Sequence, residues 1–285
     1  MEHSDARARR MWRLFEPIHV VTYFAAEARA AFEGAGLRGF WRGYFAGRAA
    51  PLGAAAAAPV TAAFYNFAPA MVARALPGVW GLISPAEALE VRSAGAVAAL
   101  GRLLTGQEDS VPKVADLLAQ AAGDLDCAGR VLASANAALP VPDEPVARLW
   151  HAATVLREHR GDGHFAALLA ADIDGCEALV LRPSADIPRE QIQPLRGWAD
   201  ADWDAAAARL SARGLLGPDG TLTSAGAEVR REVERVTDTA AARPWQDEHF
   251  TTALAGLLRP IAVACAAELP YPNPVGVPEP TGGPS

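Results

Sequence analysis

The chain has 285 residues and a formal net charge of -7, and its composition is 51% apolar and 21% charged. The apolar content excludes a largely disordered chain, and the length allows two modest domains. The negative charge, with Lys113 as the only lysine, provides no general electrostatic attraction to nucleic acid. Apolar residues recur at helical spacing and strand-like alternation is almost absent, so we predict an all-α or mainly α fold.

We expect residues 1–182 to form a helical domain, because helix start and stop signals follow one another closely. Ser84, Pro85 and Glu87 make a helix start, as N-cap, first helical residue and capping-box partner. The predicted helices cover residues 5–24, 26–34, 37–48, 59–67, 69–76, 85–104, 111–122, 126–139, 144–159, 163–170 and 175–181.

Residues 49–73 carry no charge and are the only stretch that suggests a membrane span. Pro51, Pro59 and Pro69 interrupt this alanine-rich stretch, so we expect short buried helices and no membrane association. The chain does not begin with a clean apolar run that ends in a cleavage site, which argues against a signal peptide.

The three cysteines, Cys127, Cys176 and Cys265, are far apart and form no CxxC pair. We expect them to be buried free thiols, which is typical of a protein in the reducing cytoplasm. The sequence contains no phosphate-binding loop, nucleophile elbow or zinc-protease motif. The cofactor is therefore unknown, and whether a metal or haem is bound stays open.

The densest group of polar side chains lies in residues 158–164, EHRGDGH. His164, His159 and Glu158 are the candidate catalytic residues, because a histidine held by a carboxylate can act as a general base. His151 shares their helix face two turns earlier and is a candidate ligand-binding residue. A metal site is only weakly indicated, because the histidine pair at i and i+4 of a helical zinc site is missing.

Within that segment, residues 160–163 predict a tight turn between two helices, with Asp162 as the cap of the second helix. Arg160 beside such a helix start could bind an anionic ligand. The plain alternative is a capped and solvated turn that has no ligand. Both Arg160 and Asp162 are candidate ligand-binding residues.

Other candidates for a ligand pocket lie on the helices before residue 70, where aromatic, cationic and amide groups mix. Such a mixture suits either ordinary core packing or a cradle for a flat ligand. A lone histidine on an apolar face is more often a hydrogen-bonded core residue, and a buried amide needs a partner in the protein or in a ligand. The candidates are His19, Tyr23, Trp41, Arg42, Arg48 and Asn66.

Residues 183–269 predict a winged helix with long C-terminal helices, and the junction falls near Ser184. A helix at 188–195, a turn at 197–199 and a helix from Asp200 come first. Leu215 to Thr223 then reads as a tight hairpin, and long helices follow at 223–240 and 247–268. The proline-rich tail, 270–285, is expected to be disordered.

DNA binding by this unit is disfavoured. The residues that would enter the major groove include Asp200, Asp202 and Asp204, which phosphates would repel. From Ser184 to Trp245 there are ten acidic residues and eight arginines, and the hairpin tip has no basic residue. We therefore favour a winged helix that is reused for packing or dimerisation.

The run RLSARGLL…GTLTSAG resembles the winged helix of the MarR type. Over most of its length, the chain also resembles an actinobacterial family of MarR-like helix-turn-helix proteins with a helical N-terminal region. The matching stretches are Met11–Phe24, Phe40–Gly53, Phe64–Pro77, Leu156–His164 and Gly197–Leu216. The resemblance implies this architecture and no particular activity.

We expect a regulator-like winged-helix protein that binds a small molecule in its helical domain, with a homodimer formed through the long helices as one arrangement. The alternative is an enzyme of specialised metabolism whose pocket uses histidines and carboxylates, with the winged helix kept as scaffold. A purely structural partner-binding module is the third reading.

Overall fold

A computed structural model describes residues 4–182 and 187–279 of the chain, and regular secondary structure in them is helical, with no sheet. The α-helices of the described residues are α1 Ser4–Phe24, α2 Ala26–Gly34, α3 Phe40–Ala49, α4 Ala57–Phe64, α5 Pro69–Ala73, α6 Pro85–Leu103, α7 Val111–Gly123, α8 Val131–Ala137, α9 Pro145–Ala170, α10 Gly175–Val180, α11 Arg189–Arg196, α12 Asp200–Ala212, α13 Ser224–Ala240 and α14 Glu248–Ala266. Short 3-10 helices lie at Ala50–Leu52, Gly78–Gly81 and Arg243–Trp245. The predicted all-α class is confirmed.

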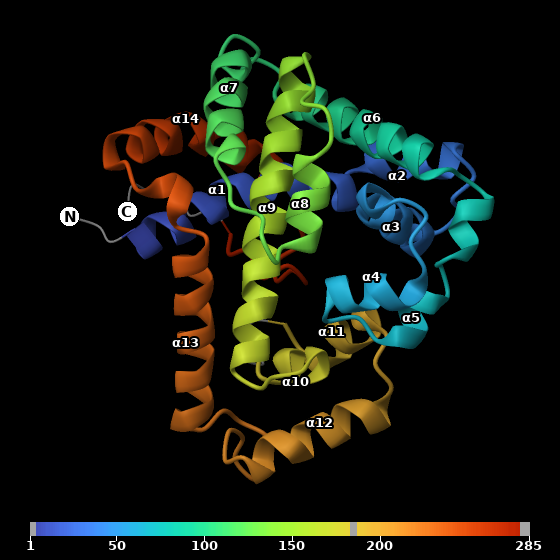
Figure 1. Ribbon diagram of the computed structural model, residues 1–285, viewed down its shortest axis with the longest axis vertical. Helices are drawn as coiled ribbons and strands as arrows, with labels where there is room; N and C mark the ends of the chain where they lie inside the picture. The colour runs from blue at the N-terminus through green and yellow to red at the C-terminus, as the bar shows by residue number, and fades with distance from the viewer. Residues whose placement is uncertain (1–3, 183–186, 280–285) are drawn as a thin grey trace.

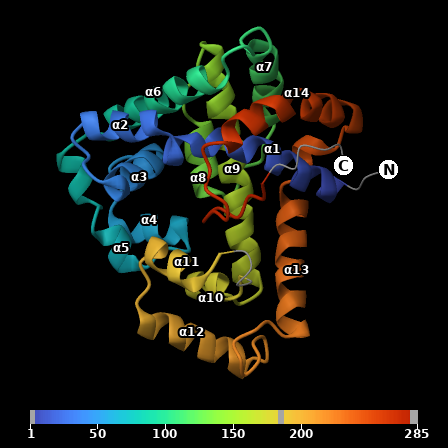
Figure 2. The same ribbon diagram turned by 180° about the vertical axis from the view of Figure 1, so that it is seen from behind.

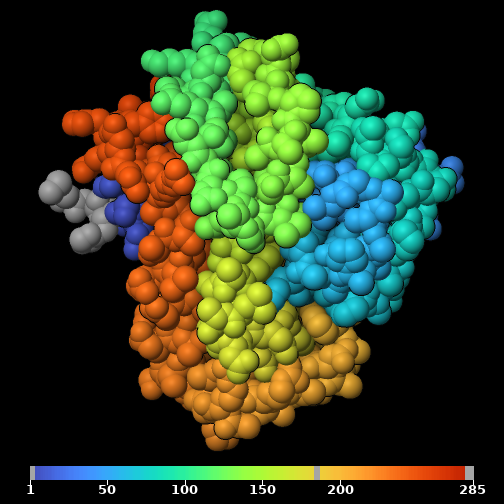
Figure 3. Space-filling view, viewed as in Figure 1, coloured from blue at the N-terminus to red at the C-terminus, as the bar shows by residue number. Residues whose placement is uncertain are grey.

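Helix α9 runs through the middle of the molecule and is the longest helix of the described chain (Figure 1). It packs against α1, α7, α8 and α13. Because neighbours surround it, most of its side chains are buried, and it lacks the one-sided apolar stripe of a surface helix. On the face shown in Figure 3, α9 lies between α13 and the segment from α3 to α5, and α12 forms one end of the molecule.

Two apolar clusters stabilise the N-terminal part. The larger is built from α1, α6, α7, α9 and α14, with Phe15, Leu118, Leu149 and Trp245 among its buried residues. The second lies under α3, α4 and α5 and includes Phe45. Burial of such side chains contributes about 1.5–3 kcal/mol each, which makes these clusters the main source of stability.

Helices α11 and α12 form a helix-turn-helix pair. Gly197 ends α11 with φ +75°, a left-handed conformation that favours glycine. A side chain there would also collide with Met71 of α5, since a Cβ would lie 2.5 Å from its Cβ. The Trp198 indole donates to the Asn66 carbonyl at 2.9 Å, and the Ala68 amide donates to the Arg196 carbonyl at 2.9 Å. The turn is therefore docked on the N-terminal region.

After α12, the chain forms a tight turn with one antiparallel bridge between Leu216 and Leu222. Helix α13 then returns along α9, so α10 to α13 form the lower part of the views in Figures 1 and 2. Whether this turn is the wing of a winged helix stays a prediction. The domain boundary stays one too, and residues 183–186 lie outside the described chain.

The predicted turn at residues 160–163 is wrong, because α9 continues through it without a break to Ala170. Gly163 serves close packing instead of a turn, because a Cβ on it would lie 2.5 Å from Nη1 of Arg130. Asp162 does not cap the following segment of its own chain. It accepts a hydrogen bond from the Ala133 amide in the first turn of α8, at 2.9 Å.

The C-terminal tail also differs from the expectation of disorder, as far as Glu279. Asn273 and Val277 are buried, and Val277 packs with Leu269 and with Val20 of α1. Figure 2 shows this segment crossing the face of the molecule near α1 and α11. The apolar and prolyl side chains stabilise it there. The remaining tail, residues 280–285, lies outside the described part of the chain.

Residues 49–73, the stretch considered for a membrane span, form a 3-10 helix, α4 and α5. Within the described chain, α14 is long and apolar enough to cross a membrane by length and composition alone, and 44% of its apolar window is buried.

Candidate functional site

A cavity of about 760 Å³ lies between α1, α3, α9, α10, α11, α13 and the C-terminal tail. Pockets for organic molecules of drug size are roughly 300–1,000 Å³. One face of α9 lines it, with Arg157, Arg160, Gly161, His164 and Leu168 at intervals of three and four residues. The cavity therefore joins segments that are far apart in the sequence.

Aromatic rings and arginines dominate the cavity wall. Among the described lining residues are seven arginines and two glutamates. The rings of Trp41 and Tyr44 meet edge to face, with centroids 5.6 Å apart. The aromatic lining residues are Trp12, Tyr23, Phe24, Phe40, Trp41, Tyr44 and Phe165. This wall suits a partly aromatic ligand with negative charge.

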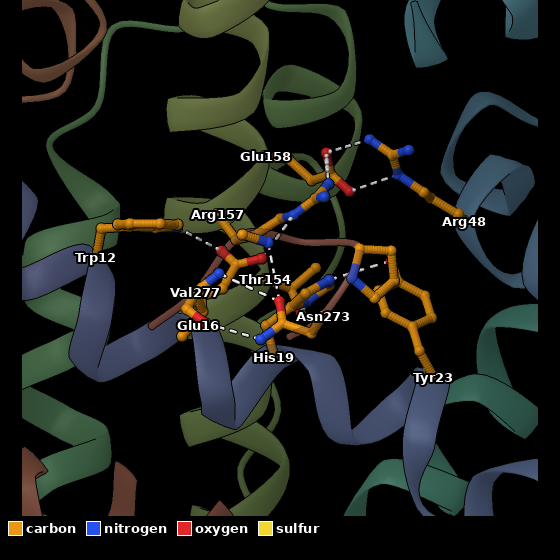
Figure 4. A network of polar contacts seen from close by, with 12 residues as sticks. Trp12, Glu16, His19, Tyr23, Arg48, Thr154, Arg157, Glu158, Asn273 and Val277 are labelled. Atoms are coloured by element: carbon orange, nitrogen blue, oxygen red, sulfur yellow. Dashed lines mark hydrogen bonds and ion pairs between the residues drawn. The ribbon is translucent and has the colours of Figure 1, made fainter. Parts of the chain in front are cut away.

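A buried ionic network extends from the cavity wall into the protein (Figure 4). Arg48 of α3 reaches both carboxylate oxygens of Glu158, at 3.1 and 3.2 Å. Arg157 lies between Glu158, at 2.8 Å, and Glu16 of α1, at 3.3 Å. Burial opposes ionisation of Glu158, but Arg157 and Arg48 hold its pKa well below the ordinary range. The network fixes α1 and α3 to α9, so Arg48 and Glu158 serve the framework instead of lining the cavity.

Burial raises the pKa of Glu16 despite its contact with Arg157. Its second oxygen accepts from the Trp12 indole at 3.0 Å. The Arg160 guanidinium lies over the Trp12 ring, 4.6 Å from its centroid. Arg160 also binds Asp238 of α13 at 2.7 Å. Trp12 and Arg160 are thus both held in place at the cavity surface.

His19 lies behind the wall, where both ring nitrogens have partners. The Thr154 hydroxyl donates to the Trp150 carbonyl at 2.9 Å, so it accepts from Nδ1–H of His19 at 3.0 Å. Nε2 then accepts from the Tyr23 hydroxyl at 3.1 Å. Burial lowers the pKa of His19 well below its ordinary value and raises that of Tyr23. A neutral, fully bonded histidine of this kind orients Tyr23 at the cavity and has no free nitrogen for catalysis.

His164 differs, because it lines the cavity itself. The Thr237 hydroxyl donates to the Val233 carbonyl at 2.7 Å and therefore accepts from Nδ1–H of His164 at 3.0 Å. Nε2 is left as an acceptor. Burial lowers the pKa of His164 to about 4, so the ring is neutral near pH 7. It can accept a hydrogen bond from a ligand, but it is a weak base.

The other predicted residues of the EHRGDGH segment do not meet at one place. His159 lies against the Asp126 carbonyl, 3.1 Å from Nε2, on the side of α9 away from the cavity lining. Burial lowers the pKa of both His159 and His151 to about 4, and His151 lies near Arg92. Asp162 is committed to the start of α8. The structure thus spreads the polar side chains of residues 158–164 over different sides of α9, and a catalytic role for His164, His159 or Glu158 stays a prediction.

Five of the predicted ligand-binding or catalytic residues line the cavity: Tyr23, Trp41, Asn66, Arg160 and His164. The Oδ1 atom of Asn66 is buried without a hydrogen-bond partner in the described structure. Arg42 is exposed on the outside of α3. The described residues contain no group of three or more histidine, cysteine or carboxylate side chains that could hold a metal ion.

Sequence reasoning missed the residues at the end of the cavity next to α11. Arg182 and Arg196 both donate to the Pro274 carbonyl, at 3.2 and 2.9 Å. It also missed Trp12 and Arg157. Arg157, Arg160 and His164 fall on one face at i, i+3 and i+7, a signal that the assumed turn at residues 160–163 concealed.

The outer face of α12 carries mainly acidic residues and residues with small side chains. Asp200, Asp202 and Asp204 are exposed, and Asp200 and Asp204 bind Arg189 of α11 at 3.0 and 2.9 Å. The positive charge at the other end of the helix is engaged too: Arg209 binds Asp174, the N-cap of α10, and Glu177 within α10. This helix thus presents no unengaged cationic side chain to a phosphate backbone.

The chain belongs to a helix-turn-helix family, whose model matches residues 8–272 and so spans both the cavity helices and the α11–α12 pair. No curated protein and no solved structure matched the chain. The family match supports the helix-turn-helix part of the sequence prediction. The narrower likeness to actinobacterial MarR-type proteins stays a prediction.

Proposed function

We propose that this protein is a regulator-like helix-turn-helix protein that binds a small organic molecule in its central cavity. The observation that carries the proposal is the cavity itself: about 760 Å³, walled by aromatic rings and arginines. Pockets of this size that mix apolar walls with a few oriented polar groups are typical ligand sites. Membership of a helix-turn-helix family supports the regulator-like part.

The position of the cavity supports coupling between ligand and helix-turn-helix. Leu195 and Arg196 on α11 and Val229 and Val233 on α13 line it, so its wall includes the helices before and after α12. A ligand that contacts both would favour one arrangement of α11 and α13 over others. The output of that arrangement is an interaction with a partner or a second copy of the chain.

Direct reading of DNA by α12 is disfavoured under this proposal. Its exposed residues are aspartates, alanines and a serine besides Arg209, which already binds two carboxylates. Base readout needs side chains such as arginine, asparagine or glutamine, together with basic neighbours that bind phosphates. The α11–α12 pair then serves as a packing unit docked on α5.

The enzyme alternative receives less support. His19 has partners on both nitrogens, and His159 lies outside the cavity lining. Among the described histidines, only His164 presents an acceptor nitrogen to the cavity, and a pKa of about 4 makes it a weak general base near neutral pH. A ligand-binding role for His164 is the better fit.

Titration with the neutral fluorescent probe phenylnaphthylamine tests the cavity. We expect saturable binding of one molecule per chain. Gly161→Trp, which fills the cavity from α9, should weaken it by about tenfold or more. Gly101→Trp is the matched control, because Gly101 is an exposed helix glycine with open space around it. Unsaturable binding, or equal loss in both variants, would reject the proposal.

A further inference from the structure

Two arginines converge on one neutral acceptor at the end of the cavity. Nη1 of Arg182 and Nη2 of Arg196 both donate to the carbonyl oxygen of Pro274, at 3.2 and 2.9 Å. Both side chains line the cavity. A single peptide carbonyl carries only a partial charge, whereas each guanidinium carries a full positive charge and can donate to two oxygens of a carboxylate.

The described residues provide no counter-ion for Arg196. Among the residues that the structure describes, no carboxylate forms an ion pair with it. Its other close groups are the Leu195 carbonyl, at 3.5 Å, and the Phe67 ring, 4.8 Å away. Burial lowers the pKa of Arg196 to about 10, and the neighbouring cation Arg182 acts in the same direction. Arg196 is half-buried, and a partly desolvated cation without a counter-ion among the described residues is unfavourable, so an anion at this place would be stabilised.

The two glutamates that line the cavity do not fill this role. Glu16 is held by Arg157, and Glu234 is held by Arg9 at 2.6 Å. The first pair links α1 to α9, and the second links α1 to α13. Each of these two carboxylates therefore already has a cationic partner. At the α11 end of the cavity, the described residues thus supply no carboxylate to Arg196.

An aromatic surface adjoins this cationic end. Phe67, on which Arg196 stacks, has its ring centroid 5.5 Å from that of Tyr44 and 6.0 Å from that of Trp41. Phe40 extends the same cluster, 4.8 Å from Trp41. Tyr44, Trp41 and Phe40 all line the cavity. A molecule with its anionic group at Arg196 can thus lay a ring against these side chains.

We propose that the ligand is an aromatic organic anion, with its carboxylate or sulfonate on Arg196 and Arg182 and its ring against Trp41 and Tyr44. The anionic oxygens take the place of the Pro274 carbonyl as acceptors for the two guanidinium groups. This inference rests on the proposed function, since it names the class of molecule that the cavity binds.

A pair of matched probes tests the charge directly. Anilinonaphthalene sulfonate and phenylnaphthylamine share one ring system, and only the first carries a sulfonate. We expect the sulfonate to bind more tightly to the unmodified protein. Arg196→Gln should weaken it by about ten- to a hundredfold, the loss of a charge-assisted hydrogen bond, and should leave the neutral probe within about twofold.

Arg74→Gln is the control for net charge, because Arg74 is exposed and outside the cavity lining. It should change neither affinity. Arg182→Gln is the second test variant and decides the matter if thermal melting shows that Arg196→Gln does not fold. If the two probes bind with equal affinity, or if the arginine variants lose affinity equally for both, the anion assignment is overturned. Binding of a small molecule in the cavity would still be supported. Binding of neither probe would reject the proposed function itself.

Discussion

The guanidinium of Arg130 occupies the space that a side chain at Gly163 would need. A Cβ on Gly163 would lie 2.5 Å from Nη1 of Arg130. Because that space is open, Arg130 donates to the His159 carbonyl of α9 and, at 2.8 Å, to the Ala240 carbonyl at the end of α13. One arginine at the start of α8 thereby ties together three helices around a glycine of α9.

Gly163→Ala should destabilise the protein by about 1–3 kcal/mol, because Arg130 must move and lose hydrogen bonds. The matched change Gly161→Ala should stabilise it by about 0.5–1 kcal/mol, because a Cβ there has only ordinary contacts and alanine favours a helix. Chemical denaturation measures both. A Gly163→Ala variant as stable as the unmodified protein would show that the Arg130 contacts are dispensable.

The same glycines explain where sequence reasoning succeeded and failed. Helix starts such as Ser84 with Glu87 were predictable, and the structure contains the complete capping box. Two glycines within three residues predict a turn, because local propensity is all that a sequence window reports. Here tertiary packing overrides that propensity: Gly163 is needed for the approach of Arg130, and the helix continues.

The candidate site was predictable only in part, for a related reason. Tyr23, Trp41 and Asn66 lie in stretches whose mixture of aromatic and polar groups is visible locally. The cationic end of the cavity is not visible in this way. Arg196 and Pro274 are 78 positions apart, and only the docking of the tail brings them together. Contacts between residues so far apart in the chain leave no periodic pattern in a single sequence.

The buried pair of Arg48 and Glu158 should be important for stability. Arg48→Met should cost about 3–5 kcal/mol, since it removes a partner from a buried, doubly hydrogen-bonded carboxylate. Arg235→Met is the control, because Arg235 and Glu232 form an exposed pair, for which the expected loss is below about 1 kcal/mol. Urea denaturation compares the two. Similar losses would mean that the buried pair contributes no more than a surface pair.

Asp162 should make stability fall as the pH rises. Burial raises its pKa from 3.8 to about 6, against the hydrogen bond from the Ala133 amide. Because the folded state holds this proton more tightly, the contribution of Asp162 is fully present below pH 3.8 and is lost as the pH rises through 6. Asp162→Asn stays neutral, so it should be more stable than the unmodified protein at pH 7.5 by on the order of 2 kcal/mol.

At pH 4 that difference should nearly vanish. The buried histidines affect stability equally in the unmodified protein and in Asp162→Asn. Their effect is opposite in sign to that of Asp162 and cancels when the two stabilities are subtracted. Thermal denaturation at a series of pH values measures the difference. A constant difference between pH 4 and pH 7.5 would contradict the raised pKa of Asp162.

The attachment of the C-terminal tail to α1 should depend on Asn273. Its Oδ1 accepts from the amides of Gly276, at 2.8 Å, and Val277, at 3.2 Å, and its Nδ2 donates to the Val277 carbonyl at 2.7 Å. Asn273→Ala removes these bonds, so the tail should detach from α1 and become a protease target. Limited proteolysis with mass spectrometry detects this, and Glu279→Ala, at an exposed position, is the control. Equal cleavage in the two variants would show that Asn273 does not hold the tail.

The acidic face of α12 leads to the last prediction. Because Asp200, Asp202 and Asp204 are exposed on α12, a labelled DNA duplex at low salt should show no rise in anisotropy with the unmodified protein. Asp202→Lys with Asp204→Lys places two cations on that face, and weak binding that declines steeply with salt should then appear. That variant shows that the assay can detect contact through α12. Salt-dependent binding by the unmodified protein, abolished by changes on α12, would instead make this helix a DNA-contacting element.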